Sequence, residues 1–142
     1  MYTIDKEHFP IVIVKLINTI ESNDELEGFF KEWLSLYEEK KEYMFIFDTT
    51  QLGMPNISYC YKLKQFMNEL RKLPKQYLKR SLILVSSSYV KYLLNFIFSI
   101  TTPLAIVHIY NLPDSSEDIN YVDVFNSVIN DELEGVTTIH PK

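Results

Sequence analysis

The polar side chains that could carry chemistry in this 142-residue sequence follow its most apolar runs. Asp48-Thr49-Thr50 come directly after the run at 43–47, and three serines at 86–88 come after the run at 81–85. If these runs are parallel strands, their carboxyl ends meet at one edge of a sheet, where ligands of open α/β proteins collect. The loop at 53–58 leads into a helix at the same edge, and the N–H groups of a helix N-terminus stabilise anions. We therefore expect a partner- or anion-binding site formed by Asp48, Thr49, Asn56, Ser58 and Lys62. The alternative is that Asp48, Asn56, Ser58 and Ser87 only cap helices and turns.

The chain lacks the residue patterns of common catalytic and metal sites. Its three histidines, His8, His108 and His140, are scattered, so their spacing predicts no set of metal ligands. Three glycines cannot build a phosphate-binding loop, and no nucleophile-elbow motif occurs. Cys60, in the first turn of a helix, is expected to be a buried structural thiol rather than a reactive one. We therefore predict a protein that is not an enzyme and uses no metal or cofactor. An enzyme acting on a small anionic substrate at the strand ends is the less favoured alternative.

Charge is distributed unevenly along the chain. The net charge is −5, but residues 57–113 contain eight basic side chains and a single acidic one, Glu69. The flanking segments are acidic. An acidic protein is not typical of nucleic-acid binders, so we expect no nucleic-acid partner. A local basic face remains compatible with an anionic partner, and the alternative is that these basic side chains face water or acidic elements of the same fold.

The apolar periodicity predicts alternating strands and helices. A helix with Ser22 as N-cap carries an apolar stripe that includes Phe29, Phe30, Trp33 and Tyr37. Strands are expected at 2–4, 11–17, 43–47, 81–85 and 104–110, and helices from Ser22, from Asn56 or Ser58 to Pro74, at 89–100, and from Ser115 to Ile129. The order β-β-α-β-α-β-α-β-α predicts an α/β fold: a four- to five-stranded, mostly parallel sheet with about four helices. We expect a single domain at residues 1–135 and a C-terminal tail at 136–142.

Two segments resemble a known family. FIFDTTQLGMPNISYCYKL at 45–63 and KRSLILVSSSYVKYLLNFIFSITTPLAIVHIYN at 79–111 are similar to STAS domains, the group of the bacterial anti-sigma-factor antagonists. LPKQYLKRSLILV at 73–85 and the very apolar helix after it resemble the STAS-like proteins grouped with CRAL-TRIO lipid-binding domains. Phosphorylatable STAS domains carry Asp-Ser-Ser-Gly or Asp-Ser-Thr-Gly where this chain has Asn56-Ile57-Ser58-Tyr59. We therefore expect Ser58 to be a helix N-cap rather than a phosphorylation site.

The resemblance implies a non-enzymatic regulatory or protein-interaction module. A protein partner is expected to dock near the Asp48–Ser58 loop and the helix that follows it. The alternative is binding to lipid or an anionic membrane surface through helix 89–100 and the basic block at 62–91. The residues of that second face would be Tyr92, Phe96, Lys91 and Arg80, although the same face could instead pack in the core or in a homodimer. The single cysteine and the absence of a signal-like N-terminus favour a cytoplasmic location.

Overall fold

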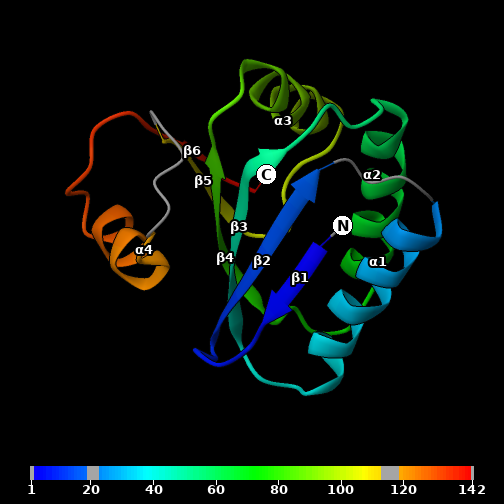
Figure 1. Cartoon of the computed structure of the whole chain (residues 1–142). Coiled ribbons are helices and arrows are strands. Elements are labelled where there is room, and N and C mark those ends of the chain that lie inside the picture. Colours follow the sequence, from blue (N-terminus) through cyan, green and yellow to red (C-terminus); the bar gives the residue numbers. More distant parts are fainter. Residues whose placement is uncertain (1, 19–22, 113–118, 142) are drawn as a thin grey trace.

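The computed structural model describes residues 2–18, 23–112 and 119–141. They form one mixed sheet with helices on both faces (Figure 1). The strands are β1 (Tyr2–Asp5), β2 (Ile11–Asn18), β3 (Tyr43–Leu52), β4 (Leu78–Val85), β5 (Ile106–Asn111) and β6 (Val136–Ile139). The helices are α1 (Asn23–Glu38), α2 (Ser58–Arg71), α3 (Ser88–Ile100) and α4 (Tyr121–Ile129).

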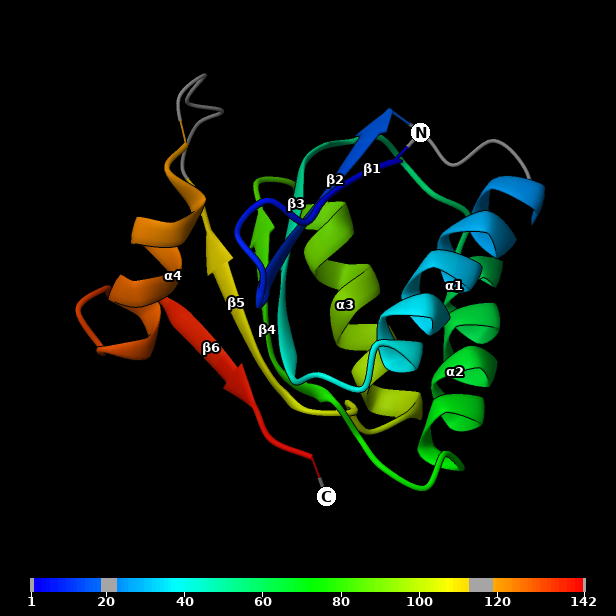
Figure 2. The same cartoon turned by 90° about the horizontal axis from the view of Figure 1, so that it is seen from below.

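The strands lie in the sheet in their sequence order, from β1 at one edge to β6 at the other. Strands β2 to β5 are parallel, and the two edge strands are antiparallel to their neighbours. Helices α1, α2 and α3 cover one face and α4 covers the other, as both views show (Figures 1 and 2). The α/β class and the mostly parallel sheet are therefore confirmed.

The strand count was wrong, because the sheet has six strands rather than four or five. Residues 136–139, expected to be part of a tail, form β6 and pair with β5. The turn into β6 is made by Gly135, whose φ of 75° is costly for residues with a side chain. Exposed Thr137 and Thr138 occupy the middle of this edge strand, so it lacks the apolar run that identified the others.

Strand β3 is covered on both faces and is longer than expected. Phe45 and Ile46 are both fully buried but belong to different clusters, Phe45 on the α1–α3 face and Ile46 on the α4 face. The sequence indicated an end at residue 47, yet the strand continues to Leu52, which pairs with Asn18 of β2. Thr49 and Thr50 are β-branched and suit a strand. Asp48 therefore lies within the strand and not at its end.

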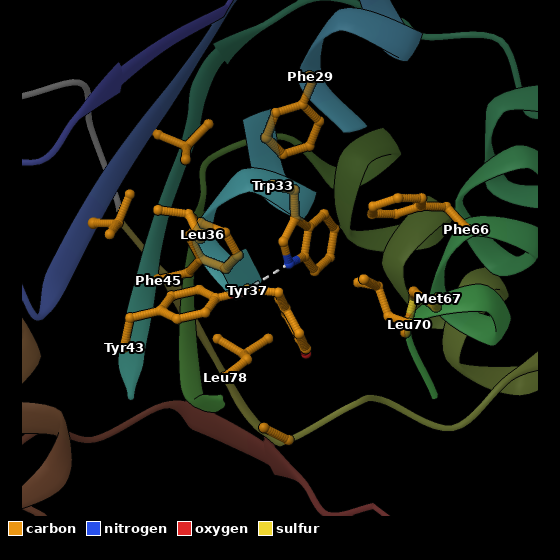
Figure 3. Packing of buried hydrophobic residues seen from close by; sticks show 13 residues of the cluster. Phe29, Trp33, Leu36, Tyr37, Tyr43, Phe45, Phe66, Met67, Leu70 and Leu78 are labelled. Carbon is orange, nitrogen blue, oxygen red and sulfur yellow. Dashed lines mark hydrogen bonds between the residues drawn. The ribbon is translucent and has the colours of Figure 1, made fainter. Parts of the chain in front are cut away.

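An aromatic cluster joins α1 to the sheet (Figure 3). The indole Nε1–H of Trp33 donates a hydrogen bond to the hydroxyl of Tyr43 at 3.0 Å. The Trp33 ring also meets Phe45 edge-on, with 5.2 Å between centroids. Such pairs add about 0.5–1.5 kcal/mol to the burial of the rings themselves. The expectation that Trp33 faces the sheet is confirmed.

Helix α4 begins later than expected. It starts at Tyr121, and Asn120 caps it by accepting a hydrogen bond from the N–H of Asp123. The start at Ser115 was therefore wrong, and that residue, like Ser22, lies outside the described residues. Phe125 and Val128 form the buried face, whereas Ile129 is exposed. Ile119 and Asn120 lie before the helix, and the capping side chain of Asn120 sets its start.

We predict that Trp33→Ala lowers the free energy of unfolding by about 3–5 kcal/mol, because it leaves a cavity and removes the indole donor to the Tyr43 hydroxyl. Chemical denaturation measures this change. The matched control is Leu34→Ala on the same helix, where the side chain is exposed and a loss below about 1 kcal/mol is expected. Equal losses in the two variants would show that the buried face of α1 is misassigned.

Candidate functional site

Both oxygens of the Asp48 carboxylate accept hydrogen bonds from within the fold. Its Oδ1 accepts hydrogen bonds from the backbone N–H and the hydroxyl of Thr50, at 2.9 and 2.6 Å. Its Oδ2 accepts the hydroxyl of Tyr121, from α4, at 2.5 Å. Burial and this bond to Asp48 raise the pKa of Tyr121, and Lys15 Nζ lies 5.4 Å from the centre of the Tyr121 ring. Asp48 thus holds α4 on the sheet.

This arrangement overturns the expected placement of Asp48 beside the 53–58 loop. Side chains alternate along a strand, and Asp48 has the same parity as Ile46, which packs on the α4 face. The loop leads instead into α2, on the opposite face (Figure 1). Thr49 does point toward α2 and α3, but it is buried, and its hydroxyl donates to the carbonyl of Leu84 at 2.6 Å. Neither side chain is exposed to a partner.

Asn56, and not Ser58, provides the polar contact at the start of α2. The side-chain oxygen of Asn56 accepts the backbone N–H of Ser58 at 2.9 Å. Ser58 is the first helical residue, and Ile57, which flanks the helix, makes no side-chain cap. The N-cap role expected for Ser58 was therefore wrong. Both Asn56 and Ser58 are exposed, and Lys62 lies one turn further along, half-buried.

Two of the three serines after β4 also have structural roles. Ser87 caps α3, accepting the N–H groups of Tyr89 and Val90, as the sequence indicated. Ser86 donates its hydroxyl to the carbonyl of Thr50 at 3.1 Å and so ties the ends of β3 and β4 together. Polar groups at this edge of the sheet mainly satisfy backbone groups nearby.

Of the four residues expected to form a lipid-binding face, three lie on α3 and Arg80 does not join them. Tyr92 and Lys91 are exposed on α3, and Phe96 lies one turn beyond Tyr92. Arg80 belongs to the opposite face of the sheet, where its Nη1 lies 2.8 Å from Nε2 of His108. Successive side chains of a strand point to opposite faces of the sheet. The position of Arg80 in a basic stretch of sequence therefore did not indicate on which face it lies.

His108 is a buried strand residue, as its position suggested. Because arginine only donates, Nε2 of His108 accepts from Arg80, and Nδ1 then donates to the hydroxyl of Thr138 on β6 at 2.9 Å. Burial, together with the charges of Arg80 and His140, lowers the pKa of His108. The neutral imidazole therefore helps to hold β6 on the sheet.

An exposed apolar surface lies at the start of α2 and on α3, and the sequence indicated only its α3 part, Tyr92 and Phe96. Met54 is 71% exposed, Tyr61 56% and Tyr92 57%. Ile57 lies one turn before Tyr61, and the Tyr61 ring meets Phe96 edge-on at 5.7 Å between centroids. We call these residues, Met54, Ile57, Tyr61, Tyr92 and Phe96, the aromatic surface. Ile57 and Tyr61 are spaced i, i+4 and lie off the buried stripe of α2, and this spacing could have indicated the α2 part of the surface.

A hydrogen bond joins the loop of this surface to α3. The Tyr89 hydroxyl donates to the carbonyl of Pro55 at 2.8 Å. Cys60, under the same loop, is buried, and burial raises the pKa of its thiol. The expectation of a structural cysteine is therefore confirmed.

Comparisons with known proteins add no identification: no family model, curated protein or solved structure matches the chain. Among the residues that the structure describes, no group of three or more His, Cys, Asp or Glu side chains is placed to hold a metal ion. Within the same residues, none of the helices has the length and apolarity needed to cross a bilayer.

We predict that Asn56→Ala destabilises the protein by about 0.5–2 kcal/mol, because the N–H of Ser58 loses its acceptor. Ser58→Ala should change the free energy of unfolding by less than about 0.5 kcal/mol, since this exposed hydroxyl does not cap the helix. Thermal and urea denaturation of both variants measure the difference. The reverse order would restore Ser58 as the N-cap.

Proposed function

We propose that this chain is a non-enzymatic, STAS-like regulatory or interaction module that docks a partner protein on the aromatic surface. The observation that carries the proposal is the gathering of exposed apolar side chains there. Of the seven large hydrophobic side chains exposed among the described residues, four belong to this surface. Burying such side chains against a partner gains about 25 cal/mol per Å² of apolar area.

Four members of the surface come from two neighbouring helices. Ile57, directly before α2, lies one turn before Tyr61, and Tyr92 and Phe96 lie on one face of α3. The contact between Tyr61 and Phe96 links the two helices. Tyrosine is favoured at protein interfaces because it combines a large apolar ring with a polar end and loses little conformational entropy.

Charge around the patch favours an acidic partner. Lys62 directly follows Tyr61, and Lys91 directly precedes Tyr92. Glu69 is the only acidic residue between positions 57 and 113, and it lies toward the other end of α2. A basic rim increases the rate of association with an acidic surface and weakens with salt.

The structural roles of Asp48, Thr49 and Ser87 support a protein without catalytic activity. Asp48 and Thr49 are buried and hydrogen-bonded within the fold, and Ser87 caps α3. A general base needs access to the proton that it removes. The resemblance of 45–63 and 79–111 to STAS domains points in the same direction, since it implies a regulatory or protein-interaction module.

An anionic membrane surface is the second candidate, favoured by the apolar side chains flanked by Lys62 and Lys91. Recognition of anionic lipid usually takes four to eight basic residues close together. Arg80 lies on the opposite face of the sheet, and Lys72 and Lys75 lie beyond the C-terminal end of α2. The electrostatic attraction available beside the patch is therefore small, at about 1 kcal/mol per basic residue.

We predict that Tyr61→Glu and Tyr92→Glu each abolish capture of a specific protein from a lysate of the source cells by the immobilised chain. A carboxylate at the centre of the patch is costly to desolvate. Leu34→Glu, a similar change at an exposed site on α1, is the control and should capture as wild type does. Capture unaffected by either tyrosine substitution would contradict docking on this surface.

Flotation with vesicles of phosphatidylcholine alone, or with phosphatidylserine added, separates the second candidate from the first. We expect the chain to stay with the soluble fraction in both cases. Flotation that requires phosphatidylserine and is lost in Tyr92→Glu would favour the membrane surface and contradict the protein partner.

A further inference from the structure

A cavity of about 200 Å³ lies between the sheet and the three helices on its larger face. The sheet contributes side chains such as Phe47, Ile83 and Val107, and the helices contribute others such as Phe30, Leu63 and Leu93. Protein interiors rarely contain voids much larger than a water molecule. A cavity of this size is therefore a feature that needs an explanation beyond ordinary packing.

The wall of the cavity is almost entirely apolar. Its polar side chains are uncharged and include Thr49, Asn56 and Ser81, and no charged side chain of the described residues lines it. The hydroxyl of Thr49 is already bonded to the carbonyl of Leu84. A carboxylate or ammonium group would lose its hydration here without gaining a partner. The wall therefore selects an uncharged occupant.

The volume limits the size of that occupant. A protein cavity of about 150 Å³ with an aliphatic and aromatic wall stays dry and binds benzene. A cavity of 200 Å³ has room for a benzene ring with a short substituent. A long acyl chain or a phospholipid exceeds this volume. The described residues of the wall also include no charged side chain to pair with a lipid headgroup. We propose that the cavity is a binding site for a small, uncharged, apolar molecule of the size of an alkylbenzene.

The route into the cavity runs beside the aromatic surface. Pro55 and Asn56, in the loop after β3, line the cavity, and their neighbours Met54 and Ile57 are exposed. The bond from the Tyr89 hydroxyl to the Pro55 carbonyl holds this loop against α3. We expect the ligand to enter beside this loop.

Ethylbenzene and benzoate, similar in size but different in charge, test the site in the full chain. Methyl NMR should show saturable shifts for Leu93, Ile97 and Val107 with ethylbenzene, and none for Val128, which belongs to α4 and packs on the other face of the sheet. Tm should rise with ethylbenzene concentration. Benzoate should produce neither effect. The absence of saturable shifts with ethylbenzene, or equal binding of benzoate, would overturn the proposal.

Substitutions that fill the cavity provide the second test. Ala105 and Ser81 line it, and Ala105→Leu or Ser81→Val should weaken ethylbenzene binding by roughly ten-fold or more, because added carbons occupy the ligand's space. Val128→Leu is the matched control and should retain wild-type affinity. If one filling variant does not fold, the other decides. Unchanged affinity in a folded filling variant would contradict this location.

Tyr89→Phe tests the route. Loss of the hydroxyl frees the loop, so the exchange of ethylbenzene should become faster while its affinity stays within about three-fold of wild type, a change of roughly 0.7 kcal/mol. Unchanged exchange rates would contradict access beneath this loop.

Discussion

The alternation of strand β3 is the constraint on which the rest of the structure depends. Because the strand lies inside the sheet and is covered on both faces, each of its side chains must fit one of two different environments. Tyr43 and Phe45 meet the aromatic side chains of α1, whereas Ile46 and Asp48 meet the α4 side. A shift of one residue would exchange these two sets and bury Asp48 among aromatic rings. The register of β3 therefore decides on which face of the sheet each of its polar and apolar side chains lies.

This division separates structural polar groups from exposed apolar ones. On the α4 face, Asp48 and Tyr121 join helix to sheet, and His108 joins Arg80 and Thr138 across three strands. On the other face, three helices enclose the apolar cavity and leave tyrosines exposed where α2 and α3 meet. The proposed partner surface and the proposed ligand cavity thus share one side of the sheet. The loop at Pro55 borders both, and an occupant of the cavity could influence docking through it.

Much of the fold followed from the sequence because the apolar runs are strong and local. The central parallel strands, the sheet-facing Trp33, the Ser87 cap and buried Cys60 each depend on a periodicity or a short-range preference. The errors arose where the outcome depends on a partner distant in sequence. Asp48 looked like a turn residue until Tyr121 supplied its partner, and the Thr-rich β6 needed β5 to become a strand.

The candidate site was harder to predict than the fold. A basic block in sequence suggested one charged face, but Arg80 lies on a strand and faces away from α3, which carries Lys91. At the start of α2, two polar residues only two positions apart could each cap the helix, and the sequence did not show that Asn56 rather than Ser58 makes the contact. The cavity involves seven elements of structure or the segments next to them, so no local pattern could reveal it.

Asp48 attaches α4 to the sheet and does not belong to a binding surface, and a double-mutant cycle tests this role most directly. The free energies of unfolding of wild type, Asp48→Asn, Tyr121→Phe and the double variant give the coupling energy between the two side chains. We predict a coupling of about 1–3 kcal/mol, as expected for a part-buried hydrogen bond to a carboxylate. Additive effects, with a coupling below about 0.3 kcal/mol, would contradict the assignment and return Asp48 to the list of candidate binding residues.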